Sequence, residues 1–174
     1  MNTSQLVRIF TKIGGDFQGV FTNDNFRIVN RGYYIVNTVS DPSIMGHWVL
    51  FHIDERNNVN FIDSFAKNPR IYGGNISKIC NELNAKNVVN IQLQSDDSLL
   101  CGLYCVYFVF YLTKEYSFKR ILSHFSYNYR MNDRIVERIL SKLGIQKCEL
   151  NFCPMMMYNR KCLRVCTCLH TCNK

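Results

Sequence analysis

Hydrophobic and polar residues alternate in some parts of the chain and recur at helical spacing in others, which predicts an α+β domain. Alternating or β-branched runs predict strands at 47–54, 58–65 and 87–94, and the turn-forming "ERNN" separates the first two. Helical spacing predicts helices at 4–14, 75–86, 101–116, 117–125 and 132–143, with Ser4 and Asn75 as caps of the first two. We therefore expect a small, mostly antiparallel sheet flanked by helices.

The cysteine content changes near residue 147, and this is the only domain boundary that the sequence indicates. Six of the nine cysteines belong to residues 148–174, which we interpret as a Cys-rich basic C-terminal tail after a 1–147 domain. Strict alternation would put four tail residues on one side of an extended chain, which makes them weak candidates for a zinc site: Cys166, Cys168, His170 and Cys172. A thiol-rich tail without metal is the alternative interpretation.

The net charge of +8 is spread along the chain without a Lys/Arg-rich block. Such a field favours polyanions such as nucleic acid, although solubility alone also produces it. The N-terminal stretch lacks the pattern of a signal peptide, and the longest apolar run, 99–112, is shorter than the ~20 residues of a membrane span. We expect a protein used inside a cell, without membrane contact, whose cysteines are thiols, metal ligands or a catalyst.

Cys101 lies where the polar loop "LQSDDSLL" gives way to the most apolar predicted helix. Backbone N–H groups at a helix N-terminus stabilise a thiolate and lower its pKa, which makes this cysteine a candidate nucleophile. Cys105, one turn further along the same face, is expected to be buried and inert. In the alternative interpretation, both cysteines are small core residues.

A thiolate nucleophile needs a base, and strand parity distinguishes His47 from His52, which point to opposite faces. Folding the predicted hairpin about Glu55 puts His47 opposite Asp63, close enough for a hydrogen bond. A slip of one residue would put Ser64 there instead. The alternative for Asp63 is a solvated acid at a strand end.

Gln94 closes the predicted strand 87–94, a short loop before Cys101. Its amide and the Cys101 N–H are candidate donors to an oxyanion, and a surface glutamine is the alternative.

In order and spacing, these residues resemble the adenovirus protease (adenain) family of cysteine peptidases. The resemblance rests on His47-Trp48, on the acid in "FIDSF" and on the Gln-x6-Cys-Gly-x-Tyr-Cys pattern that begins at Gln94. The segments "GGDFQGVF" and "IVNTVSDPSIMGHWVLF" are also similar to that family. Related proteases occur in virophages and in self-synthesising DNA transposons (Maverick/Polinton), and SUMO-specific proteases are distantly similar.

The resemblance covers roughly residues 4–146 and implies a papain-like, adenain-like cysteine protease fold. It implies four catalytic roles: Cys101 as nucleophile, His47 as general base, Asp63 as orienting acid and Gln94 as oxyanion donor. It also implies that Trp48 packs beside the imidazole. Adenovirus enzymes carry Glu at the position of Asp63, whereas SUMO-specific proteases carry Asp.

The resemblance further implies a monomeric endopeptidase that cleaves after small residues, often Gly, in capsid precursor proteins during particle maturation. Its place would be the virion or the nucleus or cytoplasm of the host cell. The chemistry requires no cofactor, but adenovirus enzymes use DNA and a disulfide-linked peptide as activators. The position of the cysteine that binds this peptide is Leu83 here, with Cys80 three residues earlier, so we do not expect activation by that route.

Two other functions stay open at the level of sequence. One is an isopeptidase that removes a ubiquitin-like, SUMO-type protein from its targets. The other is an inactive, basic, nucleic-acid-binding virion protein with the same fold, which the presence of all four site residues disfavours.

Overall fold

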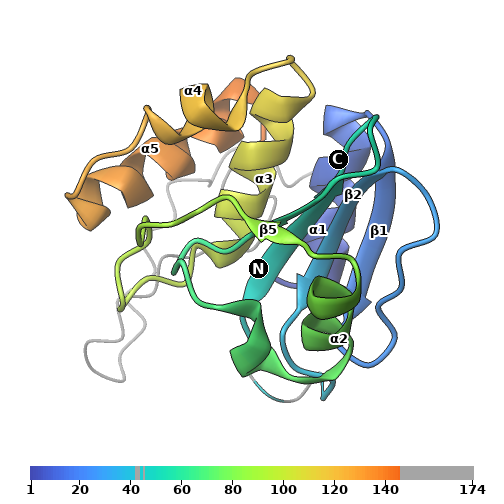
Figure 1. Cartoon of the computed structure of the whole chain (residues 1–174). Helices are drawn as coiled ribbons and strands as arrows, with labels where there is room; N and C mark the ends of the chain where they lie inside the picture. The colour runs from blue at the N-terminus through green and yellow to red at the C-terminus, as the bar shows by residue number, and fades with distance from the viewer. Residues whose placement is uncertain (42–43, 45, 146–174) are drawn as a thin grey trace.

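A computed structural model describes residues 1–41, 44 and 46–145, and these residues form a five-stranded sheet with helices packed on it (Figure 1). The elements, in chain order, are α1 (Thr3–Ile13), β1 (Phe17–Thr22), β2 (Gly32–Asn37), β3 (Trp48–Ile53), β4 (Val59–Ile62), the 3-10 helix η1 (Pro69–Tyr72), α2 (Gly74–Glu82), β5 (Lys86–Asn87), α3 (Cys101–Leu112), α4 (Phe118–Leu122) and α5 (Tyr129–Lys142). The predicted α+β class is confirmed. The expected tail, 148–174, lies outside the described residues.

The sheet has the order β1-β2-β3-β4-β5 and is mixed rather than mostly antiparallel. The pairs β2–β3 and β3–β4 are antiparallel, whereas both edge strands, β1 and β5, run parallel to their neighbours. The expectation was wrong at the edges because periodicity predicts where a strand is but not its direction. The buried Tyr34 holds the connection between β1 and β2 in place. Its hydroxyl donates to Asn30 O and accepts from the N–H groups of Val29 and Asn30.

The predicted strand 87–94 was wrong beyond Asn87. After β5 the chain leaves the ladder, and the N–H groups of Leu93 and Gln94 donate to Ser64 O, in the loop after β4. Two predicted caps were also wrong, since α1 is capped by Asn2 and α2 begins after Gly73. Asn2 forms a reciprocal capping box with the side chain three residues later, which satisfies the first N–H groups of α1.

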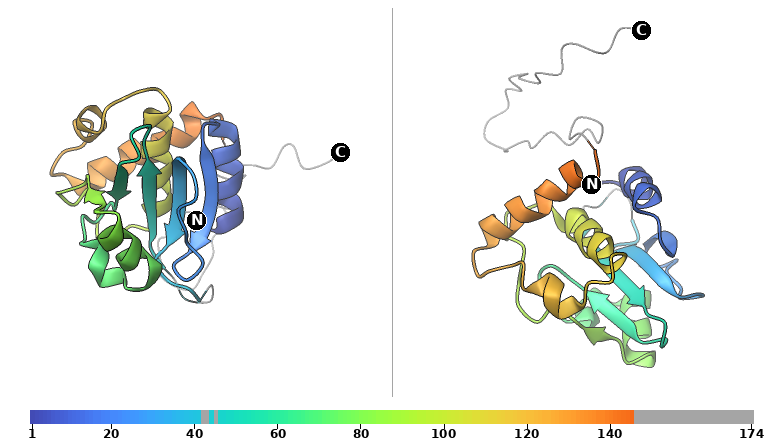
Figure 2. Two further views of the ribbon diagram at one scale, coloured as in Figure 1. Left: turned by 45° about the vertical axis from the view of Figure 1, so that its right-hand side comes forward. Right: turned by 90° about the horizontal axis from the view of Figure 1, so that it is seen from above.

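The two faces of the sheet carry separate parts of the core. Helices α1 and α3 cover one face, with α5 packed on α3, and α2 covers the other face together with the loop after β1 (Figure 2). Helix α3 is buried on nearly every side, as its uniformly apolar sequence predicts, and it packs on β3, α1 and α5. Cys101, the first residue of α3, is therefore fixed in position by a helix that lies in the hydrophobic core. Among the helices that the structure describes, none is both long and apolar enough to cross a membrane.

We predict that Gly32→Ala destabilises the protein far more than Gly14→Ala. Both glycines have positive φ, +120° and +74°. A Cβ on Gly32 would lie 1.9 Å from Asp16 O, which also accepts the Tyr33 N–H, whereas a Cβ on Gly14 meets nothing within 4 Å. We expect losses of about 3 kcal/mol or more and about 1 kcal/mol respectively, measured by urea denaturation. Equal losses would contradict the close approach at Gly32.

Candidate active site

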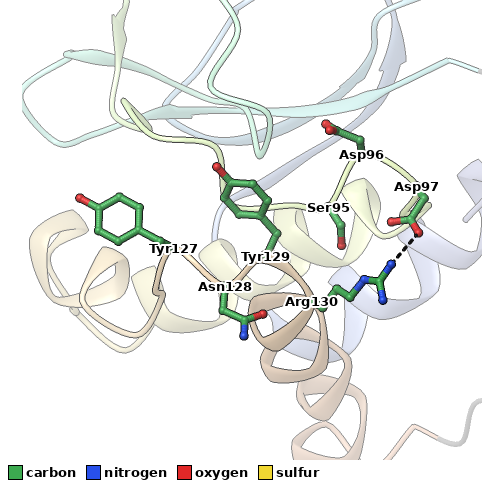
Figure 3. Close-up of a pocket in the computed structure, with 7 residues that line it drawn as sticks. All are labelled: Ser95, Asp96, Asp97, Tyr127, Asn128, Tyr129 and Arg130. Carbon is green, nitrogen blue, oxygen red and sulfur yellow. Dashed lines mark ion pairs between the residues drawn. The ribbon is translucent and has the colours of Figure 1, made fainter.

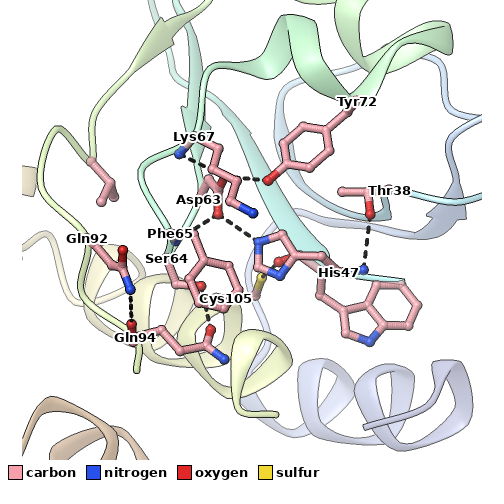
Figure 4. Close-up of polar contacts among 12 residues, drawn as sticks. Thr38, His47, Asp63, Ser64, Phe65, Lys67, Tyr72, Gln92, Gln94 and Cys105 are labelled. Atoms are coloured by element: carbon pink, nitrogen blue, oxygen red, sulfur yellow. Dashed lines mark hydrogen bonds and ion pairs between the residues drawn. The ribbon is translucent and has the colours of Figure 1, made fainter. Parts of the chain in front are cut away.

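The β3–β4 hairpin brings His47 and Asp63 together. His47 directly precedes β3 and Asp63 directly follows β4, and His47 Nε2 lies 2.7 Å from Asp63 Oδ1 (Figure 4). The register differs by two residues from the expected one, because Phe51 faces Phe61 rather than Val59. A shift of two residues keeps every side chain on its face of the sheet. The expected contact is present for that reason.

Asp63 is fully buried, and its carboxylate accepts hydrogen bonds from four donors. Oδ1 accepts from His47 and from the Phe65 N–H at 2.9 Å, and Oδ2 accepts from the Lys67 N–H at 3.1 Å and the Tyr72 hydroxyl at 2.6 Å. Burial raises the pKa of Asp63, but these bonds and the charge of His47 outweigh it and leave the pKa below its usual value. The carboxylate therefore stays ionised beside the imidazole.

The imidazole of His47 is enclosed by aromatic rings and is 15% exposed. The centroids of Phe65 and Tyr72 lie 4.9 Å and 6.2 Å from that of the imidazole. Burial lowers the pKa of His47, whereas hydrogen bonds to Asp63 and Cys101 raise it more, from 6.5 to about 9. His47 is therefore an imidazolium at neutral pH.

Cys101 supplies the opposite charge. Burial raises the pKa of its thiol, but the hydrogen bond to His47 and the charge of that ring outweigh burial and lower the pKa. Since Nε2 of His47 is bonded to Asp63, Nδ1 is the ring nitrogen left to exchange a proton with the thiol. The geometry and charges favour a thiolate–imidazolium pair at the N-terminus of α3, where Leu100 offers no capping side chain.

Cys105 is buried, as expected, and its inertness stays a prediction. Its Sγ lies 3.7 Å from Trp48 O, and burial raises the pKa of its thiol well above the usual value. The Trp48 indole is buried in the same core as Cys101 and donates to Met1 O at 3.0 Å. That Trp48 packs on the imidazole stays a prediction.

Gln94 is fully buried, so the surface alternative was wrong for this residue. Its Oε1 accepts from the Ser64 hydroxyl and its Nε2 donates to Ser98 O, both at 2.7 Å. An amide carries two N–H donors. Within the described part of the chain, Ser98 O is the only acceptor of this amide, so its second N–H has no acceptor there. That this N–H donates to an oxyanion stays a prediction. Figure 4 shows Gln94 beneath the His47–Asp63 pair, with Ser64 between the two.

Two residues of this site were not found from the sequence. Tyr72 ends η1, and the proline at the start of that short helix predicts a turn there but not a phenol on Asp63. Ser64 was considered only as a replacement for Asp63, whereas its hydroxyl holds Gln94. Neither contact follows from periodicity, because both depend on the path of a loop.

The expected metal and activator positions give two further results. Residues 1–41, 44 and 46–145 contain no cluster of His, Cys, Asp or Glu that could hold a metal ion. The weak zinc candidates, Cys166, Cys168, His170 and Cys172, lie outside this part of the chain. Leu83 is half exposed, but the nearby Cys80 is buried, and burial raises the pKa of its thiol to about 12. A disulfide-linked activator is not favoured at Cys80.

We predict that Asp63→Asn shifts the alkylation of Cys101 by iodoacetamide to higher pH. Without the carboxylate, the His47 imidazolium is less stable, so the thiolate loses its partner and the midpoint of the alkylation profile rises by about one pH unit or more. Tyr72→Phe removes one donor but leaves the charge, so its shift is smaller. Cys105→Ala is the control and leaves the profile unchanged. The same profile in Asp63→Asn as in the unmodified protein would contradict the coupling.

Comparison with known proteins gives no family for this chain. No protein-family model matches the sequence. No curated protein matches it significantly. Any function assigned to the chain therefore rests on its own residues and on the contacts described above.

Proposed function

We propose that this chain is a cysteine endopeptidase with a Cys101–His47–Asp63 triad and Gln94 as part of the oxyanion hole. One observation carries the proposal: His47 Nε2 lies 2.7 Å from the fully buried carboxylate of Asp63, and its hydrogen bond with the Cys101 thiol helps to shift the pKa values of both His47 and Cys101 toward the charged forms. The layout supports a papain-like, adenain-like fold, in agreement with the spacing of the same residues in the sequence.

The reaction would be acyl transfer in two steps. The Cys101 thiolate attacks the carbonyl carbon of the scissile peptide, and the oxyanion accepts from the Cys101 backbone N–H and the Gln94 amide. His47 gives its proton to the leaving amine, the C–N bond breaks, and a thioester remains. His47, now neutral, takes a proton from water as the hydroxide attacks the thioester, which releases the acid and restores the ion pair.

The substrate class in this proposal comes from the resemblance to adenain-like proteases. We infer cleavage after small residues of Gly-type sites in the capsid precursor proteins of a virus or transposon, during particle maturation. Nucleic acid is a candidate activator, since the net charge of +8 favours polyanions. A SUMO-type isopeptidase would use the same triad, so substrates distinguish the two.

We predict that Cys101→Ala abolishes peptide cleavage and that Cys105→Ala does not. Loss of a nucleophile costs on the order of 10⁴-fold or more, whereas the thiol of Cys105 is buried and its pKa is raised well above the usual value. The assay uses a panel of Gly-Gly-type peptides and ubiquitin-like fusion proteins, with and without DNA.

Cleavage of the fusions alone would replace the maturation function by the isopeptidase function. No cleavage of any substrate, with no labelling of Cys101 by a thiol-reactive probe, would support an inactive protein. Full activity in Cys101→Ala would show that another residue is the nucleophile.

We predict a bell-shaped pH dependence of kcat/KM. Activity rises as Cys101 loses its proton, at a pH below the usual range of a thiol because its pKa is lowered. It falls near pH 9 as the His47 imidazolium, which protonates the leaving amine, is itself deprotonated. The measurement is kcat/KM from pH 4 to about 10. A falling limb near the usual histidine pKa would contradict the ion pair.

A further inference from the structure

The loop that carries Gln94 is attached to α3 and α5 by buried polar contacts that the triad does not use. On the N-terminal side of Gln94, Leu93 O accepts from Asn132 Nδ2 and lies within hydrogen-bonding distance of the Tyr104 hydroxyl, each at 3.0 Å. Asn132 is in the first turn of α5 and Tyr104 is in the first turn of α3. The peptide before the glutamine is therefore held from two helices.

The C-terminal side of Gln94 is held by α5, through a residue that also bonds α3. The Ser95 hydroxyl donates to Asp133 Oδ2, and the Tyr104 hydroxyl lies 2.9 Å from Asp133 Oδ1. One phenol thus joins the two sides, because its single proton is shared between Leu93 O and Asp133. Gln94 stands between two anchored neighbours, and its backbone has little freedom to move.

Asn132 shows that this attachment is specific. The residue is fully buried, its Oδ1 accepts from the Ser126 N–H at 2.9 Å, and its Nδ2 donates to Ser126 O and Leu93 O. It is not the cap of α5, because that role belongs to Asn128, whose side chain accepts from the Met131 N–H. Because the buried side-chain amide of Asn132 donates one hydrogen bond to Leu93 O, it connects the Gln94 loop to α5.

An exposed contact spans the same two segments. Arg130 and Asp97 form an ion pair at 3.8 Å across a groove of about 680 Å³, lined by 95–97 and 127–130 (Figure 3). Both side chains are more than 70% exposed. Such pairs contribute little, so the buried contacts around Leu93 and Ser95 hold the loop.

We propose that Tyr104, Asn132 and Asp133 are positioning residues that hold the Gln94 amide for oxyanion stabilisation. The inference rests on the proposed function, because it assigns a role within that reaction. In the described structure, none of the hydrogen bonds of these three residues goes to His47 or Asp63, so the set acts on the oxyanion hole and not on the thiolate. Removing one of these hydrogen bonds should slow the chemical step and leave the ionisation of Cys101 unchanged.

The test compares Tyr104→Phe with Tyr107→Phe. The two tyrosines lie one turn apart on α3 and are both buried, but the Tyr107 hydroxyl bonds His124 Nδ1 at 2.9 Å instead of the Gln94 loop. Loss of a whole oxyanion donor lowers kcat by about 10²–10³-fold. Because Tyr104→Phe would only loosen the Gln94 donor, we expect kcat to fall by about tenfold, with KM nearly constant. Tyr107→Phe should retain kcat within about twofold, and both variants should keep the alkylation profile of Cys101.

Ser95→Ala is the second variant, and it removes the bond to Asp133 without emptying the core. NMR of the Gln94 side-chain amide gives a readout that does not require cleavage. We expect changed amide shifts and faster hydrogen exchange at Gln94 in Tyr104→Phe and Ser95→Ala but not in Tyr107→Phe.

Unchanged exchange at Gln94, or equal kcat in the two tyrosine variants, would overturn the positioning role. A parallel fall of kcat and of Cys101 alkylation would also overturn it, since that pattern indicates general unfolding. If the unmodified protein cleaves nothing while Gln94 exchange responds as expected, the proposed function fails and the attachment of the loop is retained.

Discussion

The carboxylate of Asp63 has no exposed surface, so it requires hydrogen-bond donors from the protein, and the surrounding segments are arranged to supply them. Removing such a group from water costs several kcal/mol unless hydrogen bonds replace the lost hydration. The replacements come from three places: the residue before β3, the turn after β4 and the end of η1. The segment between β4 and α2 therefore closes over the carboxylate, and the same bonds fix the orientation of His47. The stability of this region and the proposed chemistry therefore depend on the same desolvated charge.

The candidate site could be predicted from the sequence where it follows from side-chain alternation and from a helix end. His47 and Asp63 meet although the assumed register was wrong, because an error of two residues preserves the face of each side chain. Cys101 begins α3 because polar residues stop and apolar ones begin there. Tyr72 and Ser64 could not be predicted, since their contacts require the loop after β4, where Ala66 has a φ of +55° and turns the chain back. Periodicity contains no information on such a turn.

The fold was harder to predict from the sequence than the candidate site. Strand β2 is buried at five of its six positions, so it shows no alternation, and β1 is half-buried throughout. Such segments do not show the pattern that identifies a one-sided strand. The run 87–94 has the composition of a strand, but beyond Val88, whose N–H donates to Phe61 O in β4, the N–H groups of Leu93 and Gln94 donate to Ser64 O in the loop after β4. Tertiary hydrogen bonding decides between ladder and loop there, and propensity does not.

The two halves of the site share two rigid supports. Asp63 orients the imidazole, and the next residue, Ser64, holds the Gln94 amide through its hydroxyl and the Gln94 backbone through its carbonyl. Cys101 and Tyr104 lie in the first turn of the buried helix α3, so the proposed nucleophile and the phenol that contacts the Gln94 loop move as one body. Acyl transfer requires the thiolate, the proton donor and the oxyanion donors to converge on one carbonyl group. Two adjacent residues after β4 and one turn of α3 hold the groups that the proposed reaction would use.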